Sequence, residues 1–204
     1  WAHENGRKFY HFEHGTDEKY NIQNNPAGHA YFDPLYGLGI TEKADMILNM
    51  RSYDTASEVY KNAAREILLV VLQALENMNP DRAKGITTDE GEIRKIYDAL
   101  NNMIILEGAC EGKEIYHSVK RINEESKARS SIKGHALENL KSDLNTILIS
   151  EFGQWIKKPK ETSERFIDLF ELTRDEENPP VILFGLNSDS EREFAKYFGS
   201  LIMG

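Results

Sequence analysis

The sequence contains a single cysteine, Cys110, among 204 residues. One cysteine cannot form a disulfide within the chain, and this is typical of proteins from a reducing compartment. No other cysteine or histidine lies near Cys110 at a metal-ligand spacing, so we expect a plain buried thiol. We therefore predict that this chain lies on the cytoplasmic side of the cell.

Long hydrophobic runs are also missing. The longest unbroken apolar run covers residues 67–72, far short of the roughly 20 residues that cross a membrane. No secretory signal is visible, and the chain starts with Trp1 rather than methionine. We therefore expect a piece of a longer or processed protein, whose other parts could carry a membrane anchor or a targeting segment.

Motifs for catalysis are absent as well. The sequence has no G-x-x-x-x-G-K-[ST] loop to bind phosphates, and no catalytic residue is predicted in this chain. His11 and His14 stand near His3 and Glu13, but in a strand positions i and i+3 point to opposite faces. No metal site and no bound cofactor are therefore expected.

Helical spacing of apolar residues dominates the middle of the chain. The strongest helix follows a capping box of Thr55 and Glu58 and ends at Asn79-Pro80. A second box, Thr87 and Glu90, predicts the start of a helix whose apolar stripe runs through Ile104. The remaining predicted helices cover residues 41–50, then 113–129 and 131–150, the last two being alternatively one helix broken near Gly134. We expect four or five packed helices.

The ends of the chain show a different pattern. Residues 181–184, "VILF", follow two prolines and precede Gly185, which is typical of a strand buried on both faces of a parallel sheet. A second strand is predicted at residues 8–12, and a helix after Ser188. We expect residues 181–184 either to pair with 8–12 or to leave an exposed apolar edge that another copy could cover.

The predicted fold class is therefore mainly α, a helical bundle inserted between strands of a partial α/β domain. In this division, residues 1–39 are a remnant of the α/β domain with a connecting loop. Residues 40–160 form an all-α domain, and residues 161–204 supply the return strand and helix of the α/β domain.

Positive charge is concentrated in residues 113–133, which hold six Lys/Arg against three Glu in a chain of net charge −9. The overall charge disfavours polyanion binding across the whole surface. A local basic strip could still bind DNA or an acidic partner, although a solvated helix face remains the alternative. No aromatic residues suited to stacking on single-stranded bases alternate with these cations. The candidate residues are Lys120, Arg121, Lys127, Arg129 and Lys133.

Asn187 follows the predicted return strand directly. Polar residues at the carboxyl ends of strands in open α/β sheets often face the ligand crevice. Asn187 is therefore a candidate for proximity to a nucleotide crevice, and its alternative role is to open the turn before the next helix.

Three segments resemble the cytoplasmic part of type IV secretion coupling proteins, the hexameric, membrane-anchored ATPases of conjugation and protein secretion related to FtsK-type DNA translocases. They are "AYFDPLYGLGITEKADMILNM", "VYKNAAREILLVVLQAL" and "PPVILFGLNSDSEREFAKYFGSLIMG". The resemblance covers most of the chain in order, through hydrophobic patterns. The matching positions are Asp33-Pro34, then Tyr60, Ala63, Ala64, Ile67 and Leu68, then residues 181–187 with 194–202.

This resemblance implies an all-α substrate-recognition domain inserted in a P-loop NTPase-like motor. The family's Walker A would precede Trp1 and its Walker B would follow Gly204. The chain alone is then no ATPase, and ATP and Mg are expected only for the parent. The implied partners are a secreted or transferred substrate protein, a relaxosome component or DNA. The parent is expected to be a homo-hexamer anchored in the inner membrane, and the isolated chain a monomer. The alternative function is a stand-alone helical regulatory or protein-interaction module without motor activity.

Overall fold

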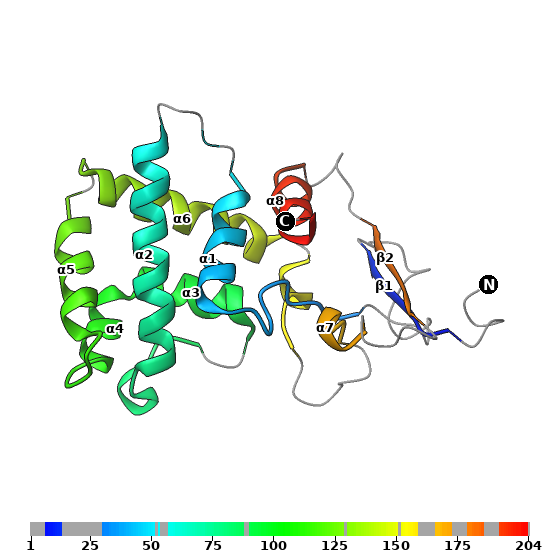
Figure 1. Ribbon diagram of the computed structural model, residues 1–204, viewed down its shortest axis with the longest axis horizontal. Helices are drawn as coiled ribbons and strands as arrows, with labels where there is room; N and C mark the ends of the chain where they lie inside the picture. The colour runs from blue at the N-terminus through cyan, green and yellow to red at the C-terminus, as the bar shows by residue number, and fades with distance from the viewer. Residues whose placement is uncertain are drawn as a thin grey trace.

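The computed structural model describes residues 7–13, 30–51, 53, 57–87, 90–128, 130–150, 152–158, 166–172, 179–185 and 192–203. In these residues the protein is mainly helical, with two short strands that pair in parallel. Figure 1 shows the helices gathered in one body and the strands beside it, with α8 (Arg192–Met203) between the two. The expectation of a mainly α fold is confirmed.

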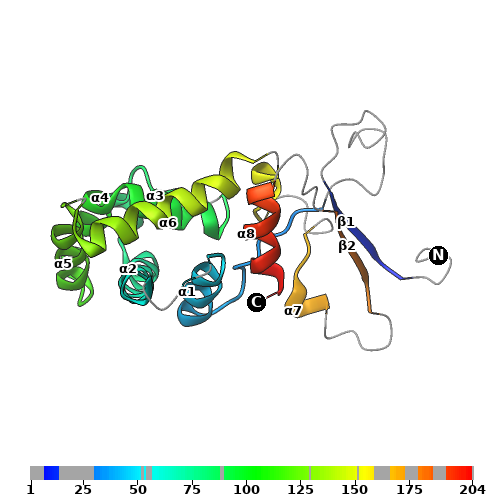
Figure 2. The ribbon, with the colours of Figure 1, turned by 90° about the horizontal axis from the view of Figure 1, so that it is seen from above.

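The helical body is arranged in two layers. Figure 2 shows α3, α4 and α6 in one layer and α1 and α2 in the other, while α5 closes the end that lies away from the strands. In chain order the helices of the body are α1 (Ile40–Asn49), α2 (Glu58–Asn77), α3 (Glu92–Asn101), α4 (Met103–Ala109), α5 (Tyr116–Ser126) and α6 (Ile132–Ile149). None of the helices in the described ranges has the length and apolar composition needed to cross a bilayer.

The core of the body is built around α2. Ile67, Leu68 and Val71 are completely buried there, and such burial needs neighbours on more than one side of the helix. These neighbours are α1, α3, α5 and α6. The sequence prediction of a central, broadly covered helix at this position is confirmed, whereas Thr55 of its predicted cap lies outside the described residues.

Short elements connect the helical body to the strands. Phe166 forms an isolated parallel bridge with Tyr31, and one helical turn follows it. These short elements are η4 (Gly153–Trp155) and α7 (Leu169–Leu172), whereas a third, η3 (Pro80–Arg82), lies within the helical body between α2 and α3.

The strands β1 (Phe9–Glu13) and β2 (Val181–Gly185) form a two-stranded parallel sheet, with Phe12 paired to Phe184. The predicted pairing between the 8–12 region and residues 181–184 is confirmed. Burial on both faces is wrong for this part of the structure, because Leu183 is 46% exposed. Side chains alternate between the faces of a strand, so Leu183 lies opposite the face that carries Phe184.

One face of the sheet packs against a cluster of phenylalanines. The Phe12 ring stacks on Phe198 of α8 at 5.3 Å and on Phe152 at 5.4 Å, and it lies 5.9 Å from Phe184. Phe32 adds an edge-on contact to Phe184 at 5.2 Å. Aromatic rings at these separations and angles attract each other beyond their burial, so the cluster fixes the sheet and α8 to the helical body.

The start of α3 differs from the sequence prediction. The helix begins at Glu92 rather than at the Thr87–Glu90 box, and its N-cap residue is Gly91 at φ 94°. The cap comes from a distant loop, because Oδ2 of Asp33 accepts a hydrogen bond from the Glu92 backbone N–H at 2.7 Å. A carboxylate at this place satisfies one of the free N–H groups of a helix start.

The predicted helix through Ile104 is divided in two. Asn102, at φ −119° and ψ 45°, leaves the helical region and separates α3 from α4. This change of direction moves Ile104 out of the buried stripe, and its side chain is 74% exposed. Farther along, α5 and α6 are two helices rather than one, and Gly134 lies inside the first turn of α6.

Candidate partner-binding surface

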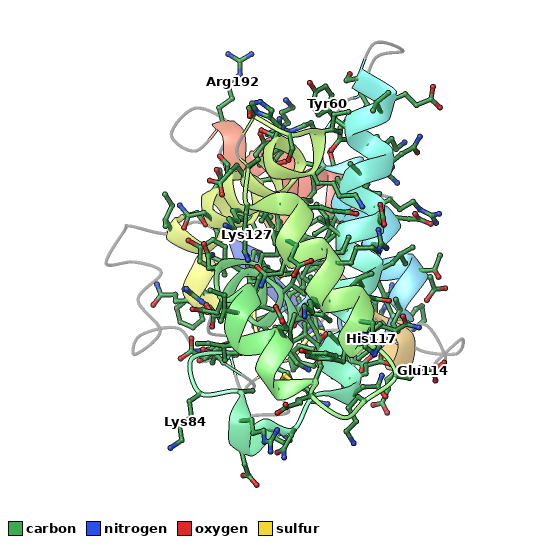
Figure 3. All side chains as sticks on the ribbon, turned by 90° about the vertical axis from the view of Figure 1, so that its left-hand side faces the viewer. Tyr60, Lys84, Glu114, His117, Lys127 and Arg192 are labelled. Carbon is green, nitrogen blue, oxygen red and sulfur yellow. The ribbon has the colours of Figure 1, made fainter. Side chains whose placement is uncertain are left out.

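The basic residues singled out in the sequence lie around the corner where α5 ends and α6 begins. Lys120 and Arg121 belong to α5, Lys127 is its C-cap residue, and Lys133 is in the first turn of α6. Arg129, between the two helices, lies outside the described residues. Figure 3 looks onto this end of the body, with Lys127 near the middle of the face and Lys84 at its lower edge.

Two of these cations are held by carboxylates. Arg121 pairs with Glu66 of α2 at 2.7 Å and with Glu125 of its own helix at 3.3 Å. Lys133 pairs with the same Glu66 at 2.7 Å and also with Glu125. Two positive and two negative side chains thus form a closed network that joins α2, α5 and α6, with no net charge.

The network changes the proton affinity of its members. The hydrogen bond from Lys133 lowers the pKa of Glu66, and the hydrogen bond from Arg121 adds to this effect. The same lysine lowers the pKa of Glu125, while the hydrogen bond to Glu66 raises the pKa of Arg121. These shifts keep the two carboxylates and the Arg121 guanidinium charged at neutral pH.

Lys120 and Lys127 differ from this pair. Both side chains are exposed, and neither forms an ion pair with another described residue. They are the candidate cations that remain available to an external anion in this part of the structure. Among the described members of the predicted basic strip, Lys120 and Lys127 are therefore the two whose charge is not balanced by an ion pair.

Sequence reasoning missed Glu66 and Glu125 as partners of the basic residues. The i,i+4 spacing of Arg121 and Glu125 is a signal that could have revealed one pair. Glu66 lies on a different helix, and its approach depends on how α2 packs against α5 and α6. That contact has no local pattern in the sequence.

A second group of charges surrounds the start of α3. The Asp33 carboxylate is 3% exposed and accepts backbone hydrogen bonds from Leu35 at 3.0 Å and Glu92 at 2.7 Å. Burial raises its pKa to about 6 in spite of those two bonds. Lys43 pairs with the Glu92 side chain at 2.5 Å nearby. This arrangement serves the fold, since both carboxylate oxygens bind the backbone of the protein itself.

The described residues contain no cluster of three or more His, Cys, Asp or Glu side chains able to hold a metal ion. Asn187, the candidate for a nucleotide crevice, lies outside the part of the chain that the structure describes. Cys110 is fully buried with its Sγ 3.8 Å from the Ala74 carbonyl oxygen, and burial raises the pKa of this thiol. Its predicted role as a plain buried thiol is confirmed.

No family model, no curated protein and no solved structure matches this chain.

Proposed function

We propose that this chain is the substrate-recognition part of a conjugation or type IV secretion coupling ATPase, a helical domain with flanking pieces of the P-loop NTPase-like motor. The observation that carries this proposal is the parallel pairing of β1 with β2. The complete helical body lies between these two strands in the chain, which is the arrangement expected of a domain inserted between neighbouring strands.

The sheet itself supports this interpretation. Parallel strands occur almost only in sheets with several strands and both faces covered by helices, and a two-stranded sheet is marginally stable by itself. Here α8 and the phenylalanine cluster cover one face, while Leu183 on the other is 46% exposed. A motor domain would supply the missing strands and the cover for the second face.

The function of recognising a substrate rests on the resemblance and on the exposed end of the body. In the proposed parent, this end receives a DNA–protein or protein substrate and passes it to an ATP-driven channel. ATP and Mg belong to the parent, which we propose to be a homo-hexamer anchored in the inner membrane with this domain on the cytoplasmic side.

The proposal of a motor is tested by sequencing the parent gene on both sides of the segment that encodes this chain. We expect a Walker A loop upstream, an Asp-Glu Walker B downstream, and ATP hydrolysis by the full product that is lost when the Walker A lysine is replaced. A full gene product without either motif would refute the motor and leave a protein-interaction module.

The test of substrate recognition uses the full product with Lys120→Glu and Lys127→Glu combined. We expect weaker binding of the substrate and less transfer, with ATP hydrolysis unchanged, because both side chains are exposed and neither pairs with a described residue. Lys84→Glu is the control for a charge reversal elsewhere, since Lys84 is also an exposed lysine and lies at the edge of the same face (Figure 3). Full binding by the double variant would contradict a role of these lysines in recognition.

A stand-alone regulatory module is the second candidate, and the phenylalanine cluster favours it. Phe194 stacks on Phe152 at 4.4 Å and Phe198 stacks on Phe12 at 5.3 Å. These contacts join α8 and β1 to the helical body without any further domain. In this alternative the gene product would end near the present chain and bind its partner without ATP.

A further inference from the structure

The break between α3 and α4 opens a groove at the exposed end of the body. The groove has a volume of about 440 Å³ and lies between this break, the end of α5 and the first half of α6. Its apolar lining includes Leu100, Met103 and Leu137, which are almost fully buried, and Ile104, which is 74% exposed. A hollow of this size is within the range that proteins use to bind ligands and anchoring side chains.

Ser126, one of the residues that line the groove, has a buried hydroxyl group without a partner among the described residues. The residue is 8% exposed, and its hydroxyl oxygen is buried without a hydrogen bond to any described residue. A buried hydroxyl is normally paired. Ser126 is one of the residues that line the groove, but its hydroxyl oxygen has almost no accessible surface there, so a ligand would gain this hydrogen bond only after the side chain rotates toward the groove.

Three asparagines around the groove add free acceptors. The side-chain amide nitrogens of Asn101 and Asn102 donate to the backbone oxygens of Tyr97 at 2.9 Å and Asp98 at 2.8 Å. That of Asn123 donates to the Glu107 carboxylate at 2.7 Å. The amide oxygens of the three receive no hydrogen bond from the described residues, and such acceptors suit the N–H groups of a peptide backbone.

The charge of the groove differs from that of the whole protein. Lys127 and Lys141 line it, and no described residue that lines it is Asp or Glu, although the chain has a net charge of −9. Lys141 also pairs with Glu138 at 3.0 Å, so the positive charge available is small. One or two carboxylates fit this charge better than a row of phosphates does.

We propose that this groove binds an acidic peptide segment of a partner protein, which inserts an apolar side chain beside Ile104 and places a carboxylate against Lys127 and Lys141. This proposal deepens the proposed function. It rests on that function only where it identifies the partner as a transferred protein. Peptide binding itself needs no motor. A nucleic acid is disfavoured because no aromatic side chain lines the described part of the groove for stacking.

The experiment begins by selecting, from a random library of twelve-residue peptides, those that bind the immobilised 204-residue chain. We expect the selected peptides to combine Asp or Glu with a neighbouring large apolar residue. A labelled consensus peptide is then titrated by fluorescence anisotropy. Selection of basic peptides, or of none above an uncoated surface, would overturn the proposal.

Ile104→Asp and Lys127→Glu are the decisive variants. Each should weaken binding of the consensus peptide about tenfold or more, because Ile104→Asp removes the apolar contact and Lys127→Glu removes the charge partner. Ile149→Asp is the matched control, because Ile149 is also 74% exposed but lies at the far end of α6. Equal loss in the control, or full binding by both groove variants, would refute the site.

The same variants show whether the fold is preserved and whether another molecule occupies the groove. Thermal unfolding of each variant is compared with the wild type, and if Ile104→Asp fails to fold, Lys127→Glu alone decides. Concentration-dependent dimerisation in sedimentation that Ile104→Asp abolishes would assign the groove to a second copy and overturn the peptide proposal. Displacement of the peptide by a single-stranded oligonucleotide would overturn it as well. A parent gene without Walker motifs would refute the motor while leaving peptide binding by this chain intact.

Discussion

The buried Asp33 carboxyl should make the stability of this protein depend on pH in a specific direction. Asp33 is 3% exposed, and its oxygens accept the backbone N–H groups of Leu35 and Glu92. Burial raises its pKa, both backbone bonds lower it, and the nearby Glu92 and Lys43 side chains act in opposite directions. Burial is the largest of these influences, so the pKa rises from 3.8 to about 6.

The sign and the size follow from proton linkage. The folded state binds the Asp33 proton more tightly than the unfolded chain does, so this contribution to stability is complete below pH 3.8 and is lost as the pH rises through 6. The full contribution is about 3 kcal/mol, and about 1.3 kcal/mol of it is gained when the pH falls from 7 to 5.

The assay is urea unfolding of the wild type and of Asp33→Asn at pH 5, 6 and 7, followed by circular dichroism. Asparagine cannot titrate, so other groups cancel in the difference between the two free energies of unfolding. We expect the wild type to gain about 1.3 kcal/mol relative to the variant between pH 7 and pH 5. A constant difference would mean an ordinary pKa, and a loss at pH 5 would mean that the two backbone N–H donors outweigh burial.

Two further predictions concern the neighbouring features of the fold. Gly91→Ala should destabilise the protein by about 1–3 kcal/mol, because φ is 94° and a Cβ would lie 2.6 Å from the Ile156 carbonyl oxygen. Gly108→Ala, with open space around its Cβ in α4, should leave stability equal or higher, and equal effects in urea unfolding would contradict this account. Glu66→Gln should lower stability by no more than about 1 kcal/mol but delay elution from heparin, because Arg121 and Lys133 lose a shared carboxylate. Glu76→Gln, the same charge change at an exposed position of α2, should delay elution less, and equal delays would show that Glu66 does not mask this surface.

Local patterns in the sequence predicted the elements whose determinants are local. The 3.6-residue period of α2 predicted both the helix and its buried residues, and the short apolar run predicted the strand β2, although not the exposed face that carries Leu183. The start of α3 was predicted wrongly for the complementary reason. Thr87 and Glu90 match a capping box, but the carboxylate that caps α3 comes from Asp33, 59 residues away in the chain, and only the packed structure brings it there.

The candidate surface shows the same difference between composition and arrangement. Composition revealed an excess of lysine and arginine in residues 113–133, but the packing of α2 against α5 and α6 brings Glu66 to Arg121 and Lys133. The groove was also hidden, since Ile104 continues a helical stripe in the sequence. The bend at Asn102 that exposes it is a backbone change with no strong local signal.

The remaining positive charge bears on which substrate this surface could receive. Each phosphate contact contributes about −0.9 to the salt slope of DNA binding. Lys120 and Lys127, the candidates without a described carboxylate partner, would then change affinity only about tenfold between 50 and 200 mM salt. Proteins that make six to ten phosphate contacts lose about a thousandfold or more over that range. Lys127 and Lys141, the two lysines that line the apolar groove, instead match the few carboxylates and the single anchoring side chain of a peptide, and this supports the proposal of a protein partner at this end of the body.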